Sequence, residues 1–106
     1  MIRRRLAEMK GGWFVGDFEP SVLRIPGAEV AVKTYARGAR EARHVHRVAQ
    51  ELTLVLGGEV QMNGERFVHG DIVLLEPGES TDFEALTDVT TVVVKVPSVA
   101  GDKYLC

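Results

Sequence analysis

The sequence predicts an all-β fold, either a sandwich or a barrel, and three observations support this prediction. About nine short runs with strand character follow one another, with turn signals roughly every six to twelve residues. After Gly11, no stretch of about ten residues or more shows the apolar period of an amphipathic helix. Eleven glycines and recurring β-branched valines suit short strands joined by tight turns.

The N-terminal part of the chain contains aromatic residues and one clearly alternating strand. Residues 1–9 place three apolar side chains on one helical face, but this segment is too short to assign. Residues 13–18 (WFVGDF) indicate a short aromatic strand and turn, and we expect residues 1–20 to pack on the rest of the fold. A short strand is expected over 22–25, and residues 29–36 (EVAVKTYA) alternate as a strand does.

The remaining strands are expected between turns that glycine, proline and asparagine mark. A polar loop over 37–42 precedes a strand over 43–47, and Gly57-Gly58 separates the strands expected over 51–56 and 59–62. Asn63-Gly64 is a strong hairpin signal, because a type I′ turn needs positive φ at both central residues. Further strands are expected over 66–68, 72–75, 82–86 and 89–96, followed by an irregular tail over 98–106.

Length and composition indicate one globular domain without a nucleic-acid or membrane partner. The 106 residues suit a single domain, and a net charge of −2 with a pI near 5.9 gives no general attraction to polyanions. No apolar run approaches the ~20 residues of a membrane span, and Glu8 and Lys10 interrupt any signal-peptide core. Cys106 is the only cysteine, so we expect no disulfide within the chain and a cytoplasmic location.

The residues best suited to chemistry gather in residues 38–58 (GAREARHVHRVAQELTLVLGG). His44 and His46 are two residues apart on an expected strand, so their side chains point to the same face. Glu51 opens the next strand, and histidine and carboxylate are good ligands for divalent metals. These three residues are therefore the candidate metal ligands and the candidate catalytic residues. His69 precedes a glycine at a strand end and is expected to be an exposed turn residue.

The spacing of Gly38, His44, His46, Glu51 and Gly58 resembles the first signature motif of the cupin superfamily, with all five anchor positions present. The resemblance implies a double-stranded β-helix, a small jelly-roll barrel, with a metal near its centre. It also implies a divalent metal ion (Fe, Mn, Ni or Zn) as cofactor. We therefore expect a single cupin domain over residues 1–106.

The second cupin motif is matched only in part. Gly70 and Gly78 stand at its glycine positions, but Thr81 takes the place of the histidine that is a fourth metal ligand in many cupins. Three alternatives follow. The three ligands hold metal alone, in the facial arrangement of non-haem iron sites. The histidines do acid–base work beside weakly bound metal. Or the pocket is inactive, and the domain is a binding or assembly module.

Strand parity predicts which residues line the pocket. The expected lining residues share the parity of Glu51 or of Thr81 on their strands. They are Thr53, Val55, Thr81, Phe83 and Ala85. Asp82 has the opposite parity and is expected to point away from the pocket. Arg40, in the polar loop, is expected at the barrel mouth, where a guanidinium can bind an anionic substrate.

The opposite parity on the same strand places Leu52, Leu54 and Leu56 on the outer face of the barrel. Three leucines on an outer sheet face make an apolar patch, and such patches commonly mark an interface. We therefore expect a homodimer. The alternative is that the N-terminal segment, with Trp13 and Phe14, covers these leucines within one chain.

The leading functional hypothesis is a small cupin-type protein that binds a divalent metal and a small polar molecule, as a non-haem metal-dependent dioxygenase or as an isomerase of a sugar or keto acid. The fold alone does not choose between these activities. The alternative is a non-catalytic ligand-binding or assembly module with a degenerate metal site. The chain has no phosphate-binding loop, dinucleotide fingerprint or nucleophile elbow, so any chemistry must come from the histidine cluster.

Overall fold

A computed structural model describes residues 1–106 and confirms the all-β prediction. The elements in chain order are the 3-10 helix η1 (Leu6–Glu8) and the strands β1 (Trp13–Val15), β2 (Glu29–Tyr35), β3 (Arg40–Val45), β4 (Gln50–Gly57), β5 (Glu59–Met62), β6 (Glu65–Val68), β7 (Ile72–Leu75), β8 (Ser80–Ala85), β9 (Val89–Val96) and β10 (Tyr104–Leu105). No helical segment has the length and apolar character that crossing a membrane requires.

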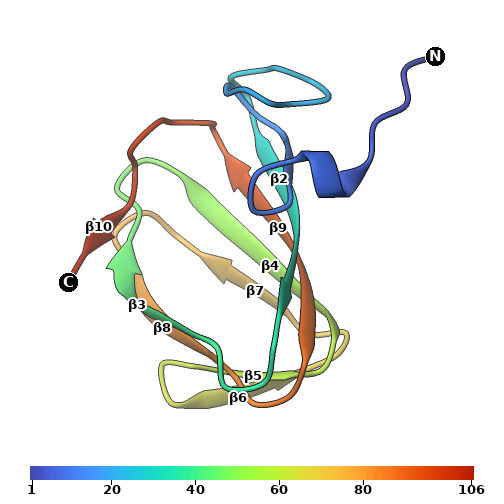
Figure 1. Cartoon of the computed structure of the whole chain (residues 1–106). Coiled ribbons are helices and arrows are strands. Elements are labelled where there is room, and N and C mark those ends of the chain that lie inside the picture. The colour runs from blue at the N-terminus through green and yellow to red at the C-terminus, as the bar shows by residue number, and fades with distance from the viewer.

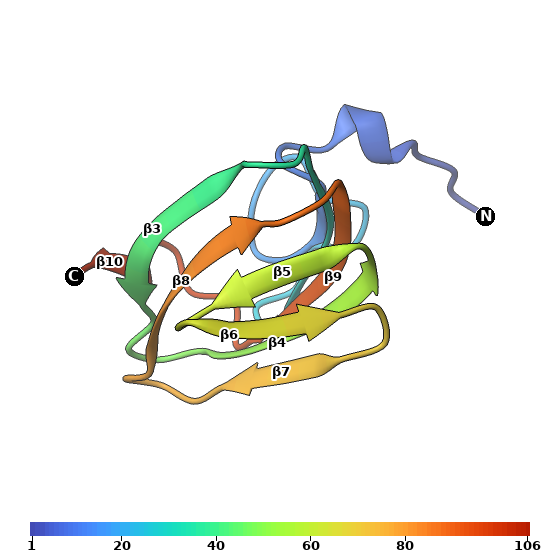
Figure 2. The same ribbon diagram turned by 90° about the horizontal axis from the view of Figure 1, so that it is seen from below.

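Two five-stranded sheets with antiparallel strands face each other across the barrel interior (Figures 1 and 2). Sheet A has the order β1-β2-β9-β4-β7, and sheet B has the order β10-β3-β8-β5-β6. Most neighbouring strands are distant in sequence, because the chain crosses repeatedly between the sheets. This arrangement is the jelly-roll barrel, or double-stranded β-helix, that the motif spacing implies.

The long strands of sheet A are in register, so rows of side chains run across both of its faces. Glu51 on β4 lies opposite Leu75 on β7 and Lys95 on β9, and Lys95 lies opposite Glu29 on β2. This row faces the barrel interior. Because side chains alternate along a strand, the rows on either side of it face outward.

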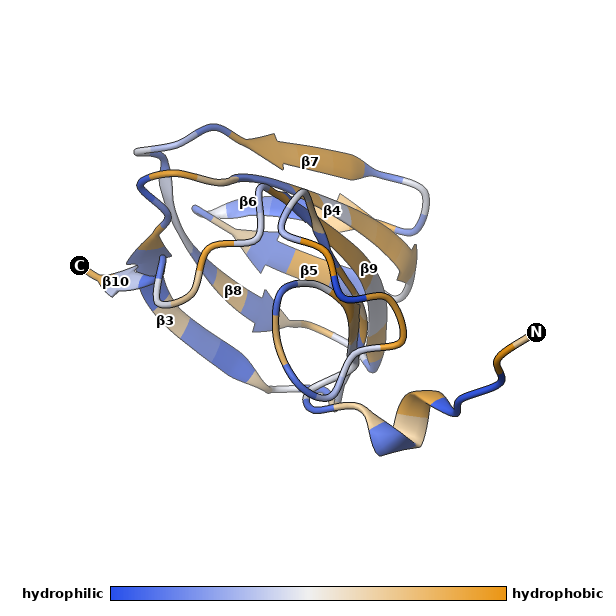
Figure 3. Ribbon diagram, turned by 90° about the horizontal axis from the view of Figure 1, so that it is seen from above, coloured by the Kyte–Doolittle hydropathy of each residue, from blue (hydrophilic) through white to orange (hydrophobic).

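Two adjacent outward rows of sheet A consist of valine, leucine and isoleucine. The two central rows are Val30–Val94–Leu52–Leu74 and Val32–Val92–Leu54–Ile72. Figure 3 shows the hydrophobic colouring of β4, β7 and β9. Leu56 and Ile72 are 58% and 64% exposed. We call these two rows together with Leu56 the outer apolar face.

The N-terminal segment does not cover the outer apolar face. β1 pairs with the edge of β2, and the indole of Trp13 lies near Lys33 and Lys95, which belong to the inward rows. Met1 and Ile2 are exposed, and the N-terminus extends away from the barrel (Figure 1). The alternative in which this segment hides the leucines of β4 is therefore wrong.

A small apolar core closes one end of the barrel. Its buried residues come from both sheets, and they are Val55, Val60, Met62, Leu75, Phe83, Ala85 and Val89. Burying a side chain of valine or leucine size stabilises a fold by about 1.5 to 3 kcal/mol. Hydrophobic burial therefore holds this end together, whereas the other end contains polar side chains.

Two turns fit their sequence signals. Asn63 and Gly64 between β5 and β6 have φ values of 52° and 76°, as the predicted type I′ turn requires. Gly58 has a φ of 88°, and a Cβ there would lie 2.2 Å from the carbonyl oxygen of Asp88. Gly58 thus lets the turn after β4 approach the turn before β9.

Three segments differ from the sequence expectation. Residues 22–25 form no strand, and only an isolated bridge joins Leu23 to Val15. β3 begins at Arg40, so residues expected in a loop are already paired with β8. The tail over 98–106 is not wholly irregular, since β10 pairs with β3 and extends sheet B. The tail therefore lies beside the strand that carries His44.

Candidate metal centre

Two strands and the connection between them position the candidate ligands. His44 lies on β3, His46 directly follows that strand, and Glu51 is the second residue of β4. A β-bulge between Glu41 and His44 shifts the pairing of β3 with β8. Because of this bulge, Glu41 and His44 both reach the barrel interior although they are three residues apart.

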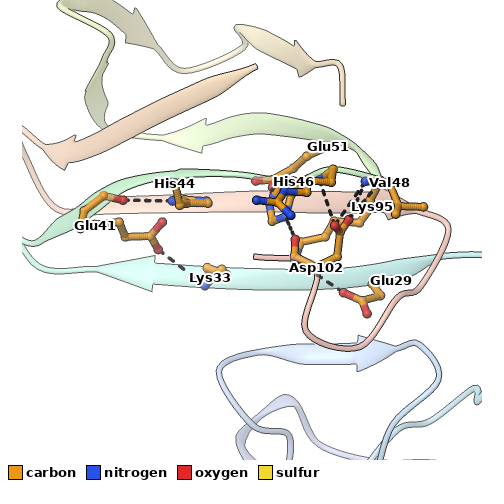
Figure 4. Close-up of polar contacts among 12 residues, drawn as sticks. Glu29, Lys33, Glu41, His44, His46, Val48, Glu51, Lys95 and Asp102 are labelled. Carbon is orange, nitrogen blue, oxygen red and sulfur yellow. Dashed lines mark hydrogen bonds and ion pairs between the residues drawn. The ribbon is translucent and has the colours of Figure 1, made fainter. Parts of the chain in front are cut away.

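The three candidate ligands converge on one small volume. Ligand atoms of His44, His46 and Glu51 all lie within 4.8 Å of one another, and both histidines are buried. The two imidazole rings meet edge to face, with centroids 5.3 Å apart. Nε2 of His46 lies 2.6 Å from Oε2 of Glu51 (Figure 4). Two imidazoles and a carboxylate gathered in this way match the donor set of non-haem metal sites.

Backbone carbonyls fix the tautomers of both histidines. Nδ1 of His44 donates to the carbonyl of Ala42 at 3.0 Å, and Nδ1 of His46 donates to the carbonyl of Asp102. A carbonyl only accepts, so in each neutral ring Nδ1 carries the hydrogen and Nε2 keeps its lone pair. The buried Nε2 of His46 has no aligned hydrogen-bond partner, although the Glu51 carboxylate is close to it. Two electron-rich atoms at this separation need a proton or a metal ion, so the residues present fit a divalent metal.

The charges at this centre also favour a bound cation. Contact with Glu51 raises the pKa of His46 above its usual value, although burial opposes the change. Burial raises the pKa of the Glu51 carboxyl, but His46, Lys95 and His44 outweigh burial, and the resulting pKa is lowered. The Glu51 carboxylate therefore favours a positive charge beside it, whether a proton on His46 or a metal ion.

Asp102 in the tail holds the loop that carries His46. Its carboxylate accepts hydrogen bonds from the backbone amides of residues 47–49 at 2.9 to 3.2 Å, in addition to the contact between its carbonyl and His46 (Figure 4). Burial raises the pKa of the Asp102 carboxyl, but the three amides hold that pKa below its usual value. The tail thus orients a candidate ligand that lies 56 residues earlier in the sequence.

The candidate centre opens into a cavity of about 360 Å³, large enough for a small organic molecule. Thr53, Thr81 and Phe83 line this cavity, on the strand faces that parity predicts. Thr81 lies directly opposite His44 across the β3–β8 pair, and its hydroxyl donates to the carbonyl of Asp82 at 2.7 Å. The hydroxyl is thus held by backbone at the place where the motif would supply a fourth ligand.

A further polar group belongs to the same cavity wall. The Tyr35 hydroxyl donates a hydrogen bond of 2.8 Å to Oε1 of Glu41, and Nζ of Lys33 lies 3.7 Å from the same oxygen. Burial raises the pKa of Tyr35, and the charges of Glu41 and Glu51 add to this effect. Tyr35 is therefore a proton donor at neutral pH, and Glu41 is a proton acceptor that faces the cavity.

Three expected lining residues lie elsewhere. Val55 and Ala85 point inward as parity predicts, but they are part of the apolar core and do not line the cavity. Arg40 is the first residue of β3, with an exposed side chain that pairs with Glu84 at 3.3 Å. The expectation that it lies at the barrel mouth is wrong, because the bulge gives the inward position to Glu41. Asp82 points away from the cavity, as expected, and pairs with Arg43.

Several cavity residues were not predicted from the sequence. They are Glu29, Lys33, Tyr35, Glu41 and Lys95. The alternation over residues 29–36 separates Lys33 and Tyr35 from Val30 and Val32, but it does not say which set faces inward. The register with β4, where parity already places the leucines outward, is the signal that assigns the faces.

Solved structures match this chain, whereas no protein-family model and no curated protein does. A conserved Klebsiella pneumoniae protein with a double-stranded β-helix domain is 27% identical, with a TM-score of 0.71 over 77% of this chain and 72% of that one. A sugar phosphate isomerase from a cupin superfamily, from Silicibacter pomeroyi, is 22% identical, with a TM-score of 0.62 over 68% and 52%. The DMSP lyase DddQ from Ruegeria pomeroyi is 20% identical, with a TM-score of 0.70 over 86% and 48%. The chain thus spans about half the length of these two enzymes.

The topology and these similarities show that the chain is a double-stranded β-helix domain. More particularly, it has the fold of solved proteins that are described as cupins, which the resemblance of its first motif implies. The isomerase and the lyase share this fold with the chain, but a shared fold does not transfer their activities to it.

Proposed function

We propose that this protein binds a divalent metal ion through His44, His46 and Glu51, and that the loaded cavity converts a small polar molecule by acid–base chemistry. One observation carries the metal assignment. The buried Nε2 of His46 has no hydrogen-bond partner and faces the Glu51 carboxylate at 2.6 Å. Iron, manganese, nickel and zinc all accept two imidazoles and a carboxylate as ligands.

Different residues of the cavity would have different roles in such a reaction. When bound, the metal supplies Lewis acidity that polarises an oxygen of the bound molecule. Backbone carbonyls hold the two histidines with Nε2 available, and Asp102 keeps the His46 loop in place. Glu41 is placed to take a proton from the bound molecule because it faces the cavity, where Tyr35 and Lys33 hold its carboxylate in position.

This proton acceptor favours an isomerase or a lyase over a dioxygenase. Isomerisation and elimination move a proton without net oxidation, so they need an acid–base group on the cavity wall and no oxidant. A dioxygenase uses the same facial ligands but does not require a wall carboxylate such as Glu41. The isomerase and lyase names of two structural neighbours agree with this class.

Metal analysis of the purified protein tests the proposal. We expect near-stoichiometric metal in the wild type, and its loss in a His44→Ala/His46→Ala double variant. His69→Ala is the matched control, since this third histidine is exposed and lies outside the cavity. Protein that stays metal-free after incubation with each of the four ions contradicts the proposal. Oxygen consumption by the loaded protein with a panel of small acids would instead support the dioxygenase.

A non-catalytic binding module is the second candidate, and Thr81 is the observation that favours it. Its hydroxyl donates to a backbone carbonyl, and a neutral hydroxyl is a poorer metal ligand than the imidazole that the motif would supply. A module of this kind would bind its ligand without consuming it. Glu41→Gln separates the two functions, because it should lower turnover in an enzyme while leaving metal content and fold unchanged.

A further inference from the structure

All four lysines of the chain line the cavity, whereas no arginine does. They are Lys10, Lys33, Lys95 and Lys103. The arginines lie on other surfaces, for example Arg40 and Arg66 in exposed ion pairs with glutamates. Because lysines and arginines lie on different surfaces, the cavity lysines are not part of a generally basic surface. Their ammonium groups are concentrated at the cavity.

Two of these lysines place their ammonium groups near one aromatic ring. Lys33 on β2 and Lys95 on β9 belong to inward rows of sheet A, and their side chains are only 27% and 19% exposed. Nζ of Lys33 lies 5.7 Å from the ring centre of Trp13, and Nζ of Lys95 lies 5.0 Å from it. The two ammonium groups therefore gather beneath a single indole, which attracts cations through its face.

Neither ammonium group makes a hydrogen bond within the protein. Lys33 has Glu41 as its nearest carboxylate and Lys95 has Glu29, each at 3.7 Å (Figure 4). These separations exceed the roughly 2.7 to 2.9 Å of a charge-assisted hydrogen bond. An ammonium group carries three donors, and partial burial without an acceptor is costly. Both side chains thus have donors available to a bound molecule.

A third unsatisfied group lies beside them. Thr91 on β9 is directly opposite Lys33 on β2, lines the cavity and is 1% exposed. Its hydroxyl has no hydrogen-bond partner. A buried hydroxyl is normally paired, so an unpaired one on a cavity wall indicates a polar ligand.

With the proposed metal bound, charge balance favours an anion as that ligand. Carboxylates equal in number to the lysines also line the cavity, namely Glu19, Glu29, Glu41 and Glu51. With neutral histidines the wall therefore has no net charge, and a divalent metal at the candidate centre would make it positive. Each inner lysine keeps a glutamate beside it, so the residual charge suits a singly charged anion better than a doubly charged phosphate ester.

We propose that Lys33, Lys95 and Thr91, together with the indole of Trp13, form a subsite for the carboxylate of a small organic acid. The subsite rests on the proposed function for the net positive charge of the cavity wall and for the reaction that follows binding, whereas its donors belong to residues other than the metal ligands. It names the substrate class of the cavity: a small monocarboxylic acid. Glu41 pairs with Lys33, so the proton acceptor lies beside the bound carboxylate.

Trp13 provides a direct readout, because it is the only tryptophan in the chain and contacts both lysines. Its emission is followed while matched acid and amide pairs are added, namely lactate with lactamide and benzoate with benzamide, and inorganic phosphate in a separate titration. We expect the acids to change the emission saturably and to bind at least about tenfold more tightly than their amides. Lys33→Gln and Lys95→Gln should each weaken acid binding about tenfold or more, whereas Arg66→Gln should not.

The controls distinguish effects on folding from effects on metal binding and on anion binding. Circular dichroism checks the fold, and Lys95→Arg keeps the charge if Lys95→Gln fails to fold. Titrations of metal-free and metal-loaded protein, with metal content measured in each, distinguish this proposal from the metal assignment. Metal-free protein that still binds acids through the lysines upholds the subsite while the proposed function fails. Acids that leave the emission unchanged or bind no better than amides overturn the subsite, as do lysine variants with wild-type affinity or tighter binding of phosphate.

Discussion

The two faces of sheet A carry opposite chemistry, in the reverse of the usual sense for a sheet of a globular protein. The inward rows contain charged residues, among them Lys33, Glu51 and Lys95, at the open end of the barrel. The two central outward rows contain only aliphatic residues across β2, β9, β4 and β7. A sheet with one solvated face normally places its apolar side chains inward and its polar side chains outward.

This reversal separates two roles. Charged groups in the interior are costly, so their concentration at one end of the barrel marks the candidate site. Farther along the same strands, the inward residues Val55 on β4 and Val89 on β9 belong to the apolar core. A broad exposed apolar face is also unfavourable in water, and such faces commonly mark interaction surfaces. The candidate site and the outer apolar face thus lie back to back on one sheet.

The largest effect is expected at the outer apolar face, which we propose is covered by a second copy of the chain. The face is uncharged and apolar, and a twofold arrangement would bury both copies of it at once. Leu52→Asp places a charge in its central row and should raise the dimer dissociation constant at least about a hundredfold. Light scattering after size-exclusion chromatography over a range of concentrations measures this change.

Leu23→Asp is the control for this variant, since Leu23 is 54% exposed but lies outside sheet A. It should leave the dimer intact, and both variants should keep their β-sheet circular dichroism. A wild-type protein that is monomeric at all concentrations would contradict the proposed dimer, as would a Leu52→Asp variant that still dimerises.

The next largest effect is expected where the tail supports the polar end of the barrel. Asp102→Ala leaves three backbone amides of residues 47–49 without their acceptor, and it should lower the free energy of unfolding by about 2 to 3 kcal/mol. It should also lower metal affinity, because the loop orients His46. Denaturant titration measures the first effect. A variant as stable as the wild type would show that the tail does not support the loop.

The pH dependence of this contribution has a defined sign. The folded-state pKa of Asp102 is below its usual value, so the charged carboxylate stabilises the fold. This stabilisation is fully present above the unfolded-state pKa of about 3.9 and is lost as the pH falls through the folded-state pKa. The stability difference between metal-free wild type and Asp102→Ala should therefore shrink below about pH 4. A constant difference down to pH 2 would contradict this assignment.

The sequence predicted the features that short-range patterns encode. The spacing of His44, His46 and Glu51 identified residues that the structure brings together, and parity on β4 placed Leu52 outward and Thr53 inward. Parity gives the face of a strand but not the depth in the barrel. Val55 therefore points inward as expected and yet belongs to the core.

What the sequence did not predict depends on long-range pairing. Asp102 is one acidic residue in a polar tail, and nothing near it in the sequence indicates the loop that it holds. The bulge between Glu41 and His44 has no local glycine signal, so the exchange of Arg40 for Glu41 at the interior could not be foreseen. Predicting that Lys33 and Lys95 face inward would have required the pairing of β2 with β9 and of β9 with β4, which the strand patterns do not specify.

The smallest effect is expected when one hydroxyl is removed. The same change on the inner and on the outer side of sheet A compares the two faces directly. Thr91→Val removes the buried, unpaired hydroxyl from the inner face and should raise the free energy of unfolding of the ligand-free protein by about 1 kcal/mol. Thr34→Val makes the same change on the outward, exposed side of β2, and should alter stability by less than about 0.5 kcal/mol. Denaturant titration of the three proteins measures both values.

If Thr91 belongs to the carboxylate subsite, Thr91→Val should also weaken acid binding a few-fold, so that the variant gains stability and loses affinity together. A destabilised Thr91→Val would mean that its hydroxyl has a partner within the fold, and the polarity of the inner face would then be structural at this position.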